Sequence, residues 1–126
     1  MKTLTKAEEQ IMQVLWELDQ AFVKEIIEEL PDPKPAYNTV STIVRILESK
    51  GFIDHEAFGK TYRYFPKISK AVYTKFSLKR LVTDYFDCSY KEMVSFFTND
   101  KSMSLSELEE IQALIQKEIE KKGGEP

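Results

Sequence analysis

The chain has 126 residues, a hydrophobic share of 42% and a formal net charge of −3, which is enough apolar material for a folded core and excludes a disordered acidic protein. Its apolar runs fall far short of the about 20 residues that a membrane span needs, and the first residues lack the apolar stretch of a secretion signal. A single cysteine, Cys88, excludes an intrachain disulfide and a pair of thiolate metal ligands. These features predict a cytoplasmic protein made of one small domain, or of one domain with an appendage.

The charge falls into three blocks along the chain. Residues 1–33 and 81–126 each carry a balance of −5, whereas residues 34–80 hold ten Lys and Arg against three acids, a balance of +7. A basic block between two acidic ones is typical of a localised surface that binds phosphates. Chance clustering on a solvated surface is the alternative.

Three amphipathic helices are predicted in the first 50 residues. The string Thr5-Lys6-Ala7-Glu8 fits a capping box that begins the first of them. Apolar residues recur three times with the i, i+3, i+4, i+7 spacing of one helical face, at Ile11, Val14, Leu15 and Leu18, at Val23, Ile26, Ile27 and Leu30, and at Val40, Ile43, Val44 and Leu47. Three prolines between residues 31 and 35 end the second helix, and Gly51 supplies a left-handed cap for the third.

The period changes to that of β-strands after Gly51. Two β-prone runs, Phe52–Glu56 and Thr61–Phe65, flank the turn residues 57–60, and Pro66 ends the second run. Three helices followed by a hairpin is the order of a winged helix-turn-helix, in which the hairpin is the wing. We therefore expect a mostly α fold with a small β-hairpin wing, the DNA-binding domain spanning residues 1–68.

Residues 69–126 are predicted to form a helical dimerisation domain. Ser69, Ser89 and either Ser104 or Ser106 can begin three helices. About 55 residues in three helices cannot bury this many apolar side chains against one another. We therefore expect a homodimer, whose interface residues would be Val72, Tyr73, Phe76, Val82, Tyr85, Phe86, Phe97, Leu108, Ile111 and Ile115.

The outward face of the third helix is the most informative functional signal. With the apolar stripe turned inward, this face carries short hydrogen-bonding side chains and one arginine, whereas an ordinary solvated face carries long Glu and Lys. Short side chains let a helix approach the major groove, and their donors suit base edges and phosphates. The expected DNA-binding residues are Tyr37, Asn38, Thr39, Ser41, Thr42 and Arg45 of this helix, with Lys60, Tyr62 and Arg63 of the wing. The alternatives are a solvated helix face and a wing lysine that serves solubility alone.

The sequence shows no constellation of catalytic or metal-binding residues. His55 is the only histidine, the four glycines form no phosphate-binding loop, and nothing marks a nucleophile elbow. We expect no enzyme, no cofactor and no metal site, and we interpret His55 as a partly exposed structural residue.

The stretch AYNTVSTIVRILESKGFIDH, residues 36–55, resembles the penicillinase and methicillin-resistance repressors of the BlaI/MecI/CopY type. The opening LTKAEEQIMQVLWELDQAFVKEI and the string LSELEEI near the C-terminus resemble the same family. The resemblance implies a dimeric repressor that binds palindromic operators ahead of β-lactamase or related genes. It also implies that a membrane sensor-transducer triggers cleavage in the C-terminal half. The tail lacks the paired cysteines of the copper-responsive branch, so copper sensing is not implied.

The resemblance also indicates a candidate cleavage site. Aligned on Met93-Val94 and on LSELEEI, the bond that corresponds to the family's cleavage point is Phe96–Phe97, where better-known members have an Asn-Phe pair. A core or dimer contact is the alternative role for these two aromatic residues. Two other functions stay open: a ligand-sensing repressor of the multidrug type, whose pocket the aromatics of residues 72–97 would line, and a winged-helix protein-interaction module that does not bind DNA.

Overall fold

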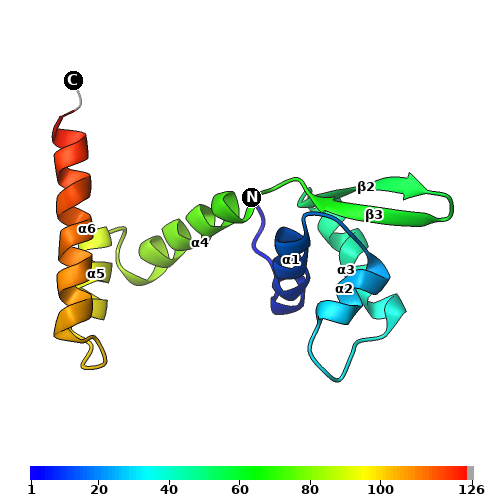
Figure 1. The fold of residues 1–126 in the computed structure, drawn as a ribbon, viewed down its shortest axis with the longest axis horizontal. Helices are drawn as coiled ribbons and strands as arrows, with labels where there is room; N and C mark the ends of the chain where they lie inside the picture. Colours follow the sequence, from blue (N-terminus) through cyan, green and yellow to red (C-terminus); the bar gives the residue numbers. More distant parts are fainter. Residues whose placement is uncertain (125–126) are drawn as a thin grey trace. The chain divides into compact units, whose positions relative to one another are not determined.

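The computed structural model describes residues 1–124 and divides into two compact units, one ending at Leu78 and the other beginning at Lys79. Within residues 1–124, no helix is both long enough and apolar enough to cross a membrane. The elements, labelled in Figure 1, are α1 (Lys6–Leu18), β1 (Ala21–Phe22), α2 (Val23–Glu29), α3 (Tyr37–Ser49), β2 (Ile53–Phe58), β3 (Thr61–Pro66), α4 (Lys70–Tyr85), α5 (Tyr90–Thr98) and α6 (Leu105–Gly123).

The first unit has the predicted three helices and hairpin. Helix α1 begins at the predicted capping box, in which the Glu8 backbone N–H donates to the Thr5 hydroxyl and the Thr5 N–H donates to the Glu8 carboxylate. After α3 the chain reverses at Gly51, whose φ of 84° lies in the left-handed region that only glycine adopts without strain. Both local predictions are confirmed.

The sheet contains one strand that was not predicted. Its order is β1-β3-β2 and all pairs are antiparallel, with His55 opposite Tyr64 in the hairpin and Ala21 opposite the same residue on the other side. Strand β2 extends to Phe58 and strand β3 begins at Thr61, so the turn is shorter than the expected turn of residues 57–60. Strand β1 has two residues, too few to show an alternating pattern in the sequence.

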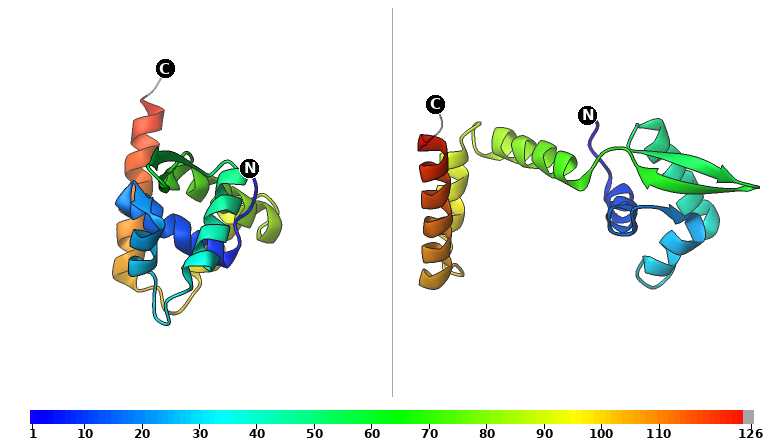
Figure 2. Two further views of the ribbon diagram at one scale, coloured as in Figure 1. Left: turned by 90° about the vertical axis from the view of Figure 1, so that its right-hand side faces the viewer. Right: turned by 45° about the horizontal axis from the view of Figure 1, so that its top comes forward.

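The core of the first unit lies between the three helices and the sheet, which Figures 1 and 2 show gathered together. The buried side chains include most of the predicted apolar stripes and add Met12, Phe52 and Ile53, whereas Leu18 is 37% exposed. Its largest fully buried members are Phe52, Ile11, Met12, Leu15, Ile26, Leu47, Ile53, Val40 and Val44. This packing holds α3 by its apolar side and leaves its polar side at the surface.

The first turns of α4 belong to this core, contrary to the expectation that Tyr73 and Phe76 face a dimer partner. Tyr73 is 6% exposed, and its ring lies 5.5 Å from that of Phe52 and 5.8 Å from that of Phe76. Its hydroxyl accepts a hydrogen bond from the Leu4 N–H at 3.0 Å. The winged-helix unit therefore continues beyond residue 68 to Leu78, because these rings cover apolar surface that the three helices and the hairpin leave open.

A partly buried ion pair joins the start of α1 to the end of α3. Glu8 is the one buried charged residue among those described, at 4% exposed, and Lys50 Nζ lies 2.7 and 2.9 Å from its two carboxylate oxygens. Burial alone would raise the pKa of Glu8, but the hydrogen bonds from Lys50 and from the Thr5 backbone outweigh it and lower this pKa below its usual value.

We expect Glu8→Gln to lower the free energy of unfolding by about 1–3 kcal/mol at pH 7, because the glutamine keeps the cap but loses the ionic partner of Lys50. Because the folded pKa of Glu8 is lowered, its contribution is complete above the unfolded value of about 4.3 and is lost as the pH falls through the folded value. Urea unfolding should therefore show a smaller difference in the free energy of unfolding between wild type and variant at about pH 3 than at pH 7. The exposed neighbour Glu9 is the control, and a Glu9→Gln variant of equal effect at pH 7 would contradict the assignment.

In the second unit, α5 and α6 lie side by side as a helical hairpin (Figure 2). The Ser89 hydroxyl accepts from the Glu92 N–H at the start of α5, and Ser104, rather than Ser106, caps α6 in a capping box with Glu107. Many apolar side chains of this unit are exposed, among them Tyr85 at 77%, Phe96 at 72%, Leu114 at 61% and Ile119 at 57%. A monomer leaves these side chains in water.

Candidate nucleic-acid interface

The polar face of α3 is exposed as predicted from its periodicity. Val40, Val44 and Leu47 are buried at 1% exposure or less, and their spacing turns the intervening positions outward. Among the residues expected to bind DNA, Ser41 is half-buried and the others in α3 are exposed, namely Tyr37, Asn38, Thr39, Thr42 and Arg45.

Two of these side chains are held by bonds within the helix. The Thr42 hydroxyl donates to the Asn38 carbonyl at 2.8 Å, so its hydrogen is engaged and its methyl group and lone pairs remain available. One guanidinium nitrogen of Arg45 donates to the Ser41 hydroxyl at 3.3 Å, which orients the arginine along the helix. The remaining donors of its planar group can still bind a base edge or a phosphate in a bidentate manner.

The N-terminus of α3 also suits a phosphate. Its N-cap residue, Ala36, makes no side-chain capping hydrogen bond, and the first turn contains no acid. The first amide N–H groups of this 13-residue helix therefore keep their hydrogen-bonding capacity, and the positive end of the helix dipole is not neutralised locally.

The wing contributes two exposed side chains and one that is packed. Lys60 and Tyr62 are exposed, whereas the guanidinium of Arg63 lies over the Phe58 ring, 4.5 Å from its centroid, and 3.5 Å from a carboxylate oxygen of Glu56. A stacked and paired arginine has fewer free donors. Arg63 therefore rigidifies the wing in this structure and is less available for a ligand than Lys60.

A cavity of about 690 Å³ lies between α3, the start of α2 and the wing. It brings together five residues expected to bind DNA, Tyr37, Ser41, Arg45, Lys60 and Tyr62. The predicted residues Asn38, Thr39, Thr42 and Arg63 do not line it. The other lining residues were not predicted from the sequence; they are Phe22, Val23, Lys24, Glu25, Glu48, Thr61 and Tyr64.

Tyr64 of β3 also lines this cavity. Tyr64 is 5% exposed; burial raises the pKa of its phenol, and the nearby Glu48 carboxylate raises it further while Arg45 opposes the change.

Among the lining residues that were not predicted, Lys24 carried a usable signal in the sequence, because the helix before a recognition helix commonly crosses the DNA backbone. Its position in the acidic block of residues 1–33 concealed it.

The second unit holds most of the residues that were predicted for the dimer interface, and these residues differ in exposure. Val82 is buried; Phe86, Phe97, Leu108 and Ile111 are half-buried; Tyr85 and Ile115 are exposed, as is Val72 of the first unit. The rings of Phe86 and Phe96 lie 5.6 Å apart beside a groove of about 630 Å³, which is lined by Leu81, Tyr85, Phe86, Glu92, Ser95, Phe96 and Asn99.

Comparison with known proteins gives a consistent set of relatives. Residues 4–117 match the family described as penicillinase repressor. The methicillin resistance regulatory protein MecI of Staphylococcus aureus strain N315 is 24% identical over 115 residues, which cover 90% of this chain and 94% of MecI. The penicillinase repressor of Bacillus licheniformis is 22% identical over 120 residues, or 94% of each chain.

One solved structure supports the fold. The DNA-binding domain of the repressor BlaI, determined in solution, matches with a TM-score of 0.50 and 28% identity, over 58% of this chain and 94% of that domain. Together with the three helices and the small sheet, this match confirms the mostly helical winged-helix fold expected from the sequence.

Proposed function

Since the chain belongs to the penicillinase repressor family, we propose that it represses transcription in the cytoplasm by binding double-stranded operator DNA as a homodimer. The observation that carries this proposal is the exposed polar face of α3, which lies beside Lys24 and Lys60 around one cavity. A helix with short polar side chains and cations at its flanks has the chemistry of a major-groove reader.

In this proposal α3 lies in the major groove and the surrounding cations bind the DNA backbone. Thr39 and Arg45 contact base edges, Arg45 being suited to the two acceptors of a guanine. Lys24, Lys60 and the free amides at the start of α3 bind phosphates, which supply most of the affinity without sequence preference. The balance of +7 over residues 34–80 supports this division.

The exposed apolar side chains of α5 and α6 support a homodimer. Burying side chains such as Phe96 and Leu114 in a partner would contribute about 1.5–3 kcal/mol each to dimer formation. This contribution exceeds the conformational entropy that the side chains lose when they become ordered. A two-fold dimer presents two copies of α3 to two half-sites related by the same symmetry, so the operator would be palindromic.

We expect Arg45→Ala and Thr39→Ala each to weaken operator binding by about 1–3 kcal/mol while the fold is retained, because both side chains are exposed and lie off the buried stripe. Fluorescence anisotropy against operator and random DNA measures the effect. Lys101→Ala, which removes a cation from the second unit, is the matched control and should bind like the wild type. Unchanged affinity in both α3 variants would show that another face contacts DNA.

The same proposal assigns the release of repression to cleavage of the Phe96–Phe97 bond, triggered by a membrane sensor-transducer protease in response to β-lactams. The proposed dimer would cover Phe96, so the bond would become accessible only when α5 frays. This helix has nine residues, a length at which a helix depends on its tertiary packing and frays readily. Cutting there separates the DNA-binding unit from α6 and removes apolar surface needed by the dimer.

Mass spectrometry of the repressor from cells exposed to a β-lactam tests this route. We expect a fragment that ends at Phe96 to accumulate as antibiotic-resistance genes of the β-lactamase type become expressed. An intact chain during full derepression would contradict cleavage.

A second candidate function, a ligand-sensing repressor of the multidrug type, is favoured by the aromatic groove at Phe86 and Phe96, since Glu92 at its edge would suit a cationic drug. Thermal shifts with phenolic and cationic compounds, followed by release of DNA from an uncut chain, would support it. A protein-interaction module without DNA binding is the remaining alternative. A mobility shift with genomic DNA fragments distinguishes that module from both repressors.

A further inference from the structure

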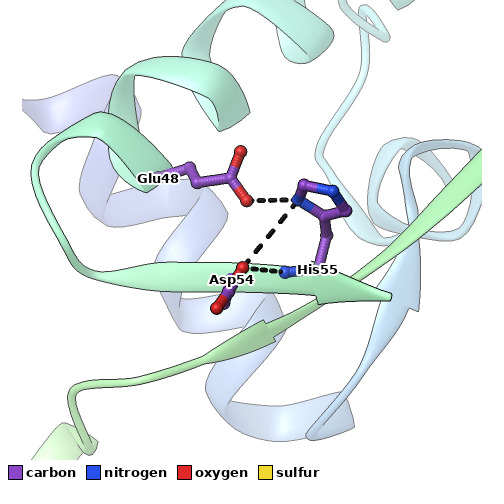
Figure 3. A group of neighbouring side chains, drawn as sticks. All are labelled: Glu48, Asp54 and His55. Atoms are coloured by element: carbon purple, nitrogen blue, oxygen red, sulfur yellow. Dashed lines mark hydrogen bonds and ion pairs between the residues drawn. The ribbon is translucent and has the colours of Figure 1, made fainter. Parts of the chain in front are cut away.

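We propose that Glu48, Asp54 and His55 form a Zn²⁺ site at the junction of α3 and β2 (Figure 3). The sequence predicted no metal site, because a lone histidine offers too few of the usual zinc ligands. The structure adds two carboxylates to that histidine, one of them from the preceding helix.

The three side chains converge on one point. His55 Nδ1 contacts a carboxylate oxygen of Glu48 and lies 3.9 Å from Asp54 Oδ1, and one ligand atom from each residue lies within 4.8 Å of the other two. Tetrahedral zinc with bonds of about 2.0–2.2 Å places its ligand atoms about 3.3–3.6 Å apart. Asp54 Oδ1 also accepts a hydrogen bond from the His55 backbone N–H at 2.8 Å, which holds this carboxylate beside the imidazole, and the three ligand atoms would adjust from their present spacing to this one when the ion binds.

The backbone that carries these ligands is firmly held. Glu48 belongs to the last turn of α3 and the other two ligands begin β2. The connection is closed by a hydrogen bond of 3.0 Å from the Phe52 N–H to the Leu47 carbonyl, and Phe52 and Ile53 are fully buried. A site on a rigid helix and strand loses little entropy when it binds an ion.

The His55 ring is positioned as well. It stacks on Tyr62 with the ring centroids 4.2 Å apart, which restricts its rotation. Figure 3 shows its Nδ1 atom turned toward both carboxylates. The imidazole therefore needs no reorientation to act as a ligand.

The donor set selects a transition metal ion over Mg²⁺ or Ca²⁺. One imidazole nitrogen with two carboxylate oxygens suits zinc, whereas the hard ions prefer oxygen ligands alone. Two negative charges match the charge of the ion, and within residues 1–124 neither carboxylate forms an ion pair with a lysine or arginine. The side chains of Glu48, His55 and Asp54 are 29%, 31% and 52% exposed, so water can supply the fourth ligand.

The test uses the full chain without an affinity tag, freed of metal with a chelator and titrated with Zn²⁺ by calorimetry. We expect one ion per chain. Asp54→Asn and His55→Ala should each weaken Zn²⁺ binding by about tenfold or more. Mutation of residues that only hydrogen-bond to a metal ligand already lowers metal affinity by about 10–100-fold. Each variant is checked for retained helix content by circular dichroism.

Two controls locate the ion. Cys88→Ser removes the only thiol and Glu29→Gln removes an exposed acid elsewhere in the first unit; both should bind Zn²⁺ like the wild type. Absence of binding to the wild type would overturn the proposal, as would unchanged binding by both Asp54→Asn and His55→Ala. Loss of binding in Cys88→Ser would also overturn it. None of these outcomes depends on whether the protein binds DNA.

Discussion

A chain cut after Leu78 is expected to bind its operator about 10²–10⁴-fold more weakly than the full chain, because it binds one half-site at a time. The fragment keeps α3, the wing and the aromatic contacts of α4, but loses α5 and α6 with their exposed apolar side chains. Titration of labelled operator DNA measures the loss, and sedimentation should report a monomeric fragment against a full chain of twice 14.7 kDa.

The cut position matters for this comparison. A fragment that ends at residue 68 lacks Tyr73 and Phe76 of the core, so we expect it to be poorly folded and to give an uninformative loss of binding. The 1–78 fragment should instead show a cooperative unfolding transition. A folded 1–78 monomer that binds the operator as tightly as the full chain would contradict the role proposed for the second unit.

Tyr73→Ala is expected to lower the free energy of unfolding of the winged-helix unit by about 3–5 kcal/mol, as removal of a buried aromatic ring leaves a cavity. The ring contacts Phe52 and Phe76 and lies 6.0 Å from that of Trp16. Urea unfolding of the 1–78 fragment measures the effect without a contribution from dimerisation.

Two matched variants separate the ring from its hydroxyl. Tyr73→Phe removes only the acceptor of the buried Leu4 N–H and should cost about 1–3 kcal/mol. Tyr37→Ala removes a tyrosine that is 50% exposed and should change stability by about 0.5 kcal/mol or less. A loss of similar size for Tyr37→Ala and Tyr73→Ala would contradict the assignment of Tyr73 to the core.

Local patterns in the sequence were enough to predict most elements of the first unit. The capping box at Thr5, the left-handed Gly51 and the stripe of Val40, Val44 and Leu47 each depend on neighbours within one or two turns. Such signals are visible in a short window because helical spacing and turn geometry fix them. The outward face of α3 followed from the same stripe.

Contacts between distant parts of the chain were not predictable in this way. The periodicity of residues 72–86 shows that α4 has an apolar side but does not say which surface covers it, so Tyr73 was assigned to the wrong neighbour. The pairing of Glu8 with Lys50 joins residues 42 positions apart, and the approach of Glu48 to His55 needs the turn at Gly51 to be in place. Each requires the tertiary fold before its partners can be named.

Selection of bound sequences from genomic DNA fragments by the purified full chain tests the central claim most directly. We predict enrichment of an inverted repeat whose half-sites are centred about 10 base pairs apart, or a multiple of that spacing, as expected for a two-fold dimer that places one α3 in each major groove. Arg45→Ala should lose the preference at defined positions of each half-site while it still binds DNA non-specifically. A bound pool with the same sequence composition as the input would contradict the claim that this chain is an operator-binding repressor.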